Sequence, residues 1–399
     1  MSFPDVLHRG DDFLNRYPRR SRAWRFFSYS TSFFVIGVSK LIIKTFYNVT
    51  LNNYSNLTAA RARSRKENRG LMTVMNHMST VDDPFIWATL PMSLYSSLEN
   101  MRWCLGAHNI CFAGKIRSFF FSAGQVLSTE RFGAGPFQGA IDASIRLLSP
   151  DNTLPFGERE GKPYLPPIVR TKPSWVHVYP EGFVLQLHPP FQNSMRYFKW
   201  GITRMILEAT RPPIVLPIFT TGFENILPED GDEGTNAQET GFQRFRRTIG
   251  TKINVSFGKP LDDALVDAYR AEWESLVSKY SSPGDTDLND TLKYGEEAQD
   301  LRSRLAAELR SAVAQIRAED PSLPEEDPRF KSPSWWKRYT MTEGKSDPDV
   351  KFIGQNWAIR RLQKFLNIEP EESQSAKSAK DEAKNLGAST DPDFNKKNN

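Results

Sequence analysis

The stretch LMTVMNHMSTVDDP, residues 71–84, joins an apolar run to a polar turn and a proline. Its first five residues carry no charge, which is typical of a strand buried on both faces of a sheet. Asn76 and His77 then fall at the carboxyl end of that strand, the edge where ligands collect in α/β sheets. Pro84 fits the first turn of a following helix. The segment therefore predicts a strand, a turn and a helix, with polar side chains in the turn.

The turn itself allows two interpretations. Asp82 follows His77 by five residues, a spacing that can fold back across a turn so that Asp82 accepts the Nδ1 proton of His77. The Nε2 atom would then be free to act as a general base near neutral pH. Alternatively, Asp82 and Asp83 have only capping roles and His77 is a surface turn residue. We expect Asp83 at the N-cap, with Ser79 or Thr80 as other candidates.

Short β-rich runs alternate with helical stretches along the rest of the chain. The strand candidates are LMTVM, QVLS, WVHVYP, IVLPIF and INVSFG. The helical candidates are PFQGAIDASIRLL, MRYFKWGITRMILEA and LDDALVDAYRAEWESLVSKY. This alternation predicts an α/β fold with a mixed, largely buried sheet flanked by helices.

Further residues suited to a site follow these strands. VHVYPEG places Glu181 and Gly182 after a strand, where an acid can bind hydroxyls and a glycine allows close backbone approach. GQVLSTERFGAGP ends a strand near Arg131, and an arginine there can bind a phosphate through two parallel hydrogen bonds. His177 within VHVYPEG fits a core role or a site-lining role equally well.

The amino-terminal part combines cations with aromatic residues. Residues 26–39 are uncharged and aromatic, a run of fourteen that is shorter than the ~20 residues a spanning helix needs. We expect a helix lying in a membrane interface with its cations on anionic headgroups, the alternative being a buried core helix with a basic start. Five arginines precede the aromatic run within ten residues that contain no acid: Arg16, Arg19, Arg20, Arg22 and Arg25.

Composition divides the chain into four parts. We expect a basic arm and anchoring segment over 1–47, an α/β domain over 48–282, and a helical, basic-aromatic extension over 283–368. Residues 369–399 are rich in Glu, Lys, Ser, Ala and Asn, which leaves little to bury, so this tail is expected to be disordered.

Other classes of function find little support in the sequence. The net charge of +5 and pI of about 9.0 favour anionic partners, but no zinc spacing or nucleic-acid-binding motif accompanies the charge. The two cysteines, Cys104 and Cys111, are too few for a metal cluster and are expected to be free, partly buried thiols. We predict no metal and no cofactor, and no GxSxG nucleophile is present.

The order of the pieces is more specific than any one of them. NHxxxxD, a glycine-led strand ending in arginine, PEG and VxPI occur in the order found in the glycerophospholipid acyltransferase superfamily. Five segments further resemble the tafazzin family of mitochondrial phospholipid–lysophospholipid transacylases in its fungal form. They are NHMSTVDDP, LGAHNICF, GQVLSTERFGAGPFQGAID, SWVHVYPEGFV and RYFKWGITRMILEA.

This resemblance implies a glycerol-3-phosphate acyltransferase-like fold and roles for named residues. It implies that His77 is the general base and Asp82 its orienting partner, with no protein nucleophile. Substrate contacts are implied for Asn76, Arg131, Glu181 and Gly182. The family's usual PEG-Thr-Arg is replaced here by Phe183 and Val184, which suits a site facing lipid, and Pro217 is implied to shape the wall of an acyl channel.

The implied activity is transfer of acyl chains between phospholipids and lysophospholipids without coenzyme A. Its substrates would be cardiolipin, monolysocardiolipin and phosphatidylcholine, on mitochondrial leaflets facing the intermembrane space, with a monotopic anchor and association with larger membrane complexes. Two alternatives stay open, an acyl-CoA-dependent lysophospholipid acyltransferase and a non-catalytic scaffold for anionic lipid. Residues 214–223 fit either lipid insertion or a core strand.

Overall fold

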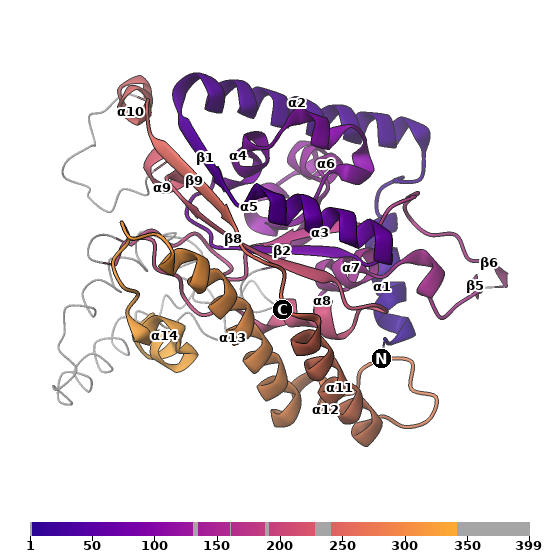
Figure 1. Cartoon of the computed structure of the whole chain (residues 1–399). Coiled ribbons are helices and arrows are strands. Elements are labelled where there is room, and N and C mark those ends of the chain that lie inside the picture. Colours follow the sequence, from indigo (N-terminus) through magenta and orange to yellow (C-terminus); the bar gives the residue numbers. More distant parts are fainter. Residues whose placement is uncertain (1, 131–134, 160, 188–190, 228–240, 341–399) are drawn as a thin grey trace, which may run out of the picture.

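The computed structural model describes residues 2–340 except 131–134, 160, 188–190 and 228–240. Its centre is a seven-stranded sheet in the order β1-β9-β8-β2-β7-β3-β4 (Figure 1). All neighbouring strands are parallel except β8 and β9, which are antiparallel. The strands are β1 (Asn48–Asn52), β2 (Leu71–Met75), β3 (Trp103–Ala107), β4 (Val126–Thr129), β7 (Trp175–Val178), β8 (Ile214–Thr221) and β9 (Lys252–Phe257). The predicted mixed α/β fold is confirmed.

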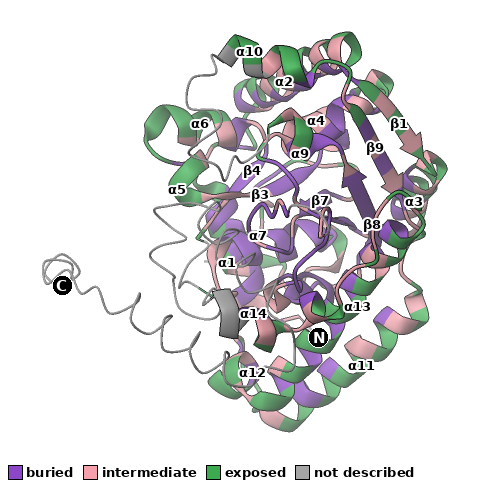
Figure 2. Cartoon of the chain, turned by 90° about the vertical axis from the view of Figure 1, so that its left-hand side faces the viewer, coloured by how far each residue is buried: buried purple, intermediate pink, exposed green. Residues whose placement is uncertain are grey.

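Alternate residues of the strands feed two separate cores, because successive side chains in a strand point to opposite faces. Met72, Val74 and Val176 belong to a core shared with α1 (Pro4–Asn15), α7 (Gly139–Leu148), α11 (Asp263–Tyr280) and α13 (Glu296–Ala318). On the other face, Leu71 and Met75 pack with α2 (Arg22–Phe46), α3 (Tyr54–Glu67) and α4 (Asp82–Thr89). Figure 2 shows the buried sheet between these two layers.

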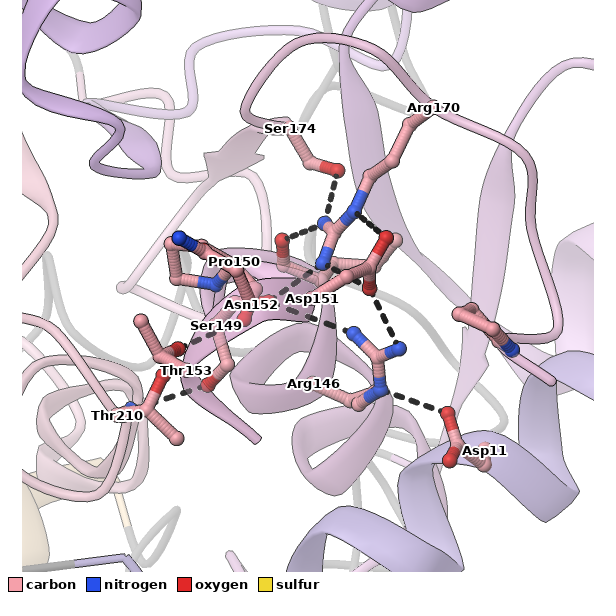
Figure 3. Close-up of polar contacts among 12 residues, drawn as sticks. Asp11, Arg146, Ser149, Pro150, Asp151, Asn152, Thr153, Arg170, Ser174 and Thr210 are labelled. Atoms are coloured by element: carbon pink, nitrogen blue, oxygen red, sulfur yellow. Dashed lines mark hydrogen bonds and ion pairs between the residues drawn. The ribbon is translucent and has the colours of Figure 1, made fainter. Parts of the chain in front are cut away.

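The first helix, α1, belongs to the same layer as α7, α11 and α13. α1 packs on α7, where Gly10 leaves no room for a side chain because an added Cβ would lie 2.5 Å from the Asp142 carbonyl oxygen. The buried Asp11 carboxylate pairs with Arg146 of α7 at 2.7 Å (Figure 3). The amino terminus is therefore joined to the α/β core by packing and by a buried ion pair.

α2 is longer than the uncharged run in its sequence. It has 25 residues and by length and composition alone could cross a membrane. One stripe along its whole length is buried against the domain, which α2 contacts through α4 and α6 (Lys115–Ala123). That stripe consists of Trp24, Ser28, Ser32, Ile36, Ser39 and Ile43.

Three sequence expectations are resolved by the fold. β8 is an interior strand whose residues are almost all buried, so residues 214–223 form a core strand rather than a lipid-inserting segment. Within MRYFKWGITRMILEA only a 3₁₀ turn (Trp200–Thr203) and the short α8 (Arg204–Leu207) are helical, because the preceding residues form buried irregular backbone. Cys104 and Cys111 form no disulfide, and they are buried and partly buried, as expected.

The carboxyl-terminal part of the described chain is helical. It contains α12 (Asp290–Tyr294), α13 and α14 (Pro333–Thr340). α13 packs against β8 and the 3₁₀ turn at Trp200, so it covers the sheet. The expected tail over 369–399 lies outside the described residues.

Candidate active site

His77 and Asp82 lie together in the turn after β2. The Nδ1 atom of His77 is 2.9 Å from Oδ2 of Asp82, and the same oxygen accepts the backbone N–H groups of Met78 at 2.7 Å and Ser79 at 3.0 Å. Because a carboxylate only accepts hydrogen bonds, Nδ1 carries the proton and Nε2 presents its lone pair. Asp82 is fully buried, whereas the His77 side chain is 22% exposed. The pair can therefore take a proton from a ligand at the protein surface.

The capping expectation for Asp83 holds for the backbone, which is extended just before Pro84, but not for the side chain, which pairs with Arg102. α4 begins at Asp82, and its N-cap position is Val81, which provides no side-chain hydrogen bond. Asp83 has a non-helical backbone (φ −104°, ψ 114°) and forms an ion pair with Arg102. Burial alone would raise the pKa of Asp83, but the Arg102 guanidinium outweighs it and lowers that pKa. The neighbouring acids thus have separate partners.

An aromatic wall supports the His77 ring. The Tyr179 ring stacks on it at 4.2 Å between centroids and 26° between planes. His177 contacts Tyr179 edge-on at 4.5 Å and Trp87 edge-on at 4.7 Å. These contacts hold one face of the His77 imidazole against the protein.

A buried hydrogen-bond chain orients His177. Trp175 Nε1–H donates to Thr73 Oγ1 at 2.9 Å, and that hydroxyl lies 2.8 Å from Nδ1 of His177. The Thr73 hydroxyl thus links the two rings, and it donates to Nδ1 of His177 or accepts from it according to the tautomer of the imidazole. Burial is the main cause that lowers the pKa of His177, to about 3, so the ring is neutral. His177 is a buried residue behind the site.

Glu181 braces the turn that holds His77. It is fully buried, and its two oxygens accept the backbone N–H groups of His77 at 2.8 Å and Arg196 at 3.2 Å. Burial raises the pKa of Glu181 to about 8, against the opposing effect of those two hydrogen bonds. Leu185 N–H also donates to the His77 carbonyl at 3.0 Å. These contacts connect the PEG segment to the turn after β2.

Gly182 needs its lack of a side chain. Its φ is +83°, and an added Cβ would lie 2.9 Å from Cε of Lys199. A left-handed backbone of this kind is readily adopted by glycine. Gly182 thus lets the chain reverse after Glu181 while Lys199 lies over it.

Asn76 lies in the sheet rather than beside His77. Its amide nitrogen donates to the Thr220 carbonyl at 2.9 Å, and its amide oxygen accepts the Thr220 N–H at 2.9 Å. The side chain is fully buried. These contacts join the ends of β2 and β8 and suit a positioning role.

Two details differ from the sequence interpretation. Phe183 and Val184 are 4% and 1% exposed, and Phe183 packs in a small core with Tyr197, so these residues do not face lipid. The side chain of Pro217 points towards Gly258 and the α13 residue Ile316, on the sheet face opposite to α2. A wall for an acyl channel at Pro217 finds no support in these contacts. Arg131 lies outside the described residues.

Sequence reasoning missed several supporting residues, namely Tyr179, Arg102 and Arg196. Tyr179 could have been noticed because it directly precedes the PEG segment. Arg102 and Arg196 gave no such signal, since their partners Asp83 and Glu181 are brought to them only by folding.

Comparison with known proteins assigns the class. A family model described as Acyltransferase matches residues 48–221, which include β2, the His77–Asp82 turn and the PEG segment. The chain is an acyltransferase.

The similar curated proteins narrow the family. Tafazzin of Saccharomyces cerevisiae is 66% identical over 375 residues, covering 92% of this chain and 97% of that protein. Tafazzin of Drosophila melanogaster is 28% identical over 255 residues, covering 63% and 57%. N-acylphosphatidylethanolamine synthase of Arabidopsis thaliana is 34% identical over 207 residues, covering 52% and 63%. The chain belongs to the tafazzin family.

Proposed function

We propose that this acyltransferase moves acyl chains between phospholipids and lysophospholipids without coenzyme A, and that it makes cardiolipin from monolysocardiolipin. The observation that carries the proposal is the pair of His77 and Asp82, with Nδ1 held at 2.9 Å and the ring partly exposed. Such a pair suits a reaction in which one hydroxyl must lose a proton to become a nucleophile.

The reaction needs no covalent protein intermediate. His77 Nε2 takes the proton of a lysophospholipid hydroxyl, and the oxygen attacks the carbonyl carbon of an acyl ester on a second phospholipid. The tetrahedral intermediate breaks its bond to the donor glycerol oxygen. That oxygen receives the proton from His77, so one ester forms as another breaks and the enzyme returns to its starting state. Asp82 stabilises the imidazolium between these steps.

The remaining residues support His77 rather than react. Glu181 fixes the backbone of His77, and Tyr179 packs on its ring, so the imidazole is held before substrate arrives. We assign Gly182 and Asn76 to the same positioning role. Arg131 is proposed to contact a substrate phosphate.

The outer surface of α2 and α6 suits contact with a membrane. We define the membrane face as the exposed residues Phe26, Phe34 and Leu41 of α2 with Ile116 and Phe120 of α6. Phe26 is 75% exposed and Ile116 87%, and apolar surface of this kind marks a lipid or protein contact. The opposite stripe of α2 is packed on the domain along its length, which favours a helix lying in the interface.

α2 also connects the membrane face to the end of the sheet at which His77 lies. β1 follows α2 and runs antiparallel to β2, since β9 is antiparallel to β8. The carboxyl end of α2 therefore lies at the same sheet edge as His77.

We propose a monotopic enzyme on mitochondrial leaflets facing the intermembrane space, which draws both substrates from the bilayer. We also propose the four-part division at 47, 282 and 368, and association with larger membrane complexes.

The test uses purified full-length protein and liposomes that contain monolysocardiolipin and phosphatidylcholine with a labelled acyl chain. We expect label in cardiolipin without added coenzyme A. Transfer that begins only after acyl-CoA is supplied would replace the proposal with an acyl-CoA-dependent lysophospholipid acyltransferase. Vesicle binding without transfer under either condition would leave a lipid-binding scaffold.

A further inference from the structure

A polar pocket lies at the sheet edge opposite to His77. It is formed around the amino ends of β3 and β7, where Trp103 and Ser174 line it, together with residues of α2. Because β2, β7 and β3 are parallel, these amino ends are at the far edge from the turn after β2. The pocket has a cavity volume of about 40 Å³.

Arg19 is a buried cation in this pocket. The residue is 5% exposed, and one guanidinium nitrogen donates to the Leu14 carbonyl. The guanidinium lies over the rings of Tyr17 at 5.1 Å and Trp103 at 5.5 Å. Its Nε has no hydrogen-bond partner in the described part of the chain, and no carboxylate there pairs with Arg19.

Burying the Arg19 guanidinium without a carboxylate partner costs free energy. Burial lowers the pKa of Arg19 to about 10, which reflects a cation removed from water without a compensating anion. Buried charges in proteins are normally paired because the loss of hydration is otherwise uncompensated. An anion in the pocket would supply the missing partner.

Arg170, which also lines the pocket, shows the contrast. Figure 3 shows its guanidinium held by the Asp151 carboxylate and the Ser174 hydroxyl, and it also donates to the Leu147 and Ser149 carbonyls. Its charge is already balanced, so Arg170 gives the pocket a rigid wall. The charge left without a partner is that of Arg19.

Two further cations stand at the pocket. Arg25 of α2 is 3.9 Å from Glu99, the one acid among the lining residues, and Lys172 is 3.4 Å from the Asn100 side-chain oxygen. Asp151 balances Arg170, so the three remaining cations, Arg19, Arg25 and Lys172, face one carboxylate. The lining is strongly positive.

We propose that this pocket binds a phosphate group, the anion that phospholipid headgroups and free phosphate share, with Arg19 as its main ligand. A planar guanidinium offers parallel N–H donors that match phosphate oxygens, and Lys172 adds a point charge. The site is separate from the His77 turn. The pocket adjoins α2, which carries part of the membrane face. If the proposed membrane contact holds, a phospholipid that is not being acylated is within reach of the pocket.

Thermal unfolding of the full-length protein in a neutral detergent tests the site. Inorganic phosphate and the phosphodiester glycerophosphoglycerol are each exchanged for chloride at constant ionic strength. A ligand that binds the folded state raises the unfolding midpoint as its concentration rises. We expect the wild type to be stabilised, and Arg19→Gln to show an apparent affinity at least tenfold weaker.

The matched control is Arg22→Gln, which removes the same charge from an exposed position three residues away. It should respond like the wild type. If Arg19→Gln fails to fold, Lys172→Gln replaces it and should weaken binding at least twofold. Stabilisation by the phosphodiester assigns the site to lipid headgroups, and stabilisation by inorganic phosphate alone assigns it to free phosphate. An unchanged wild-type midpoint with both ligands, or an equal response of the pocket variant, would overturn the proposal.

Discussion

Thr73→Val changes the buried chain behind the aromatic wall while keeping the shape of the side chain. The Thr73 hydroxyl accepts from Trp175 Nε1–H at 2.9 Å and is hydrogen-bonded to His177 Nδ1 at 2.8 Å. Trp175 and His177 are both buried, at 3% and 0% exposure. Valine would leave Trp175 Nε1 and His177 Nδ1 without their hydrogen-bond partner, and neither could reach water.

The expected cost follows from those two groups. A buried polar group that loses its partner costs about 1–3 kcal/mol, so with two such groups the free energy of unfolding should fall by about 2–6 kcal/mol. Adding His177→Phe removes the unpaired Nδ1 and keeps an aromatic ring against Trp87 and Tyr179. The double variant should therefore recover about 1 kcal/mol relative to the sum of the two single variants.

Urea unfolding followed by tryptophan fluorescence, in a detergent that keeps the protein monodisperse, measures these differences. The midpoint should move while the slope with urea stays constant, which indicates a change in stability alone. A loss below about 0.5 kcal/mol for Thr73→Val, or strict additivity in the double variant, would refute the buried hydrogen-bond chain through Thr73.

Three other outcomes are expected. Asp82→Asn should reduce the transfer rate by about 10²–10⁴-fold with little effect on vesicle binding, because the amide cannot stabilise the imidazolium. Initial rates measure the transfer and co-sedimentation measures the binding. Equal losses in both would point to misfolding. His177 has its pKa lowered to about 3, so its contribution to stability is complete above its ordinary pKa of 6.5 and is lost as the pH falls towards 3, by up to roughly 1.4 kcal/mol per pH unit. Unfolding curves should thus decline less steeply with acid for His177→Phe than for the wild type, and parallel declines would contradict the buried neutral ring. Phe34→Glu on the membrane face should weaken vesicle binding by about tenfold or more. Thr45→Glu, which changes an exposed residue of the same helix, should weaken binding less. Equal effects would show that the added charge, not the lost apolar contact, is responsible.

The sheet was predictable because its strands are short apolar runs. LMTVM became β2, and IVLPIF became β8, each buried on both faces. The helix expected over residues 195–209 forms only at 200–207, because tertiary packing of the buried Arg196 and Tyr197 overrides the helical propensity of the residues before it. The contact between α1 and α7 also left no sequence signal, since it joins positions more than a hundred residues apart.

The candidate site was predictable in part. His77 and Asp82 are close in sequence, so one turn suffices to bring them together. Folding buries the Glu181 carboxylate against two backbone N–H groups, and the positioning role that we propose for it in place of a substrate contact rests on those two partners. Partners of that kind lie on separate segments, and sequence spacing alone cannot reveal them.

The most direct test of the account compares His77→Gln with the wild type in the liposome assay, using the same protein bound to the same vesicles. Glutamine is polar and of similar size but cannot take up a proton at neutral pH. The account predicts that transfer of label to cardiolipin falls by about 10²–10⁴-fold while the unfolding midpoint and vesicle binding stay close to those of the wild type. A folded, membrane-bound His77→Gln protein that transfers acyl chains at the wild-type rate would contradict it.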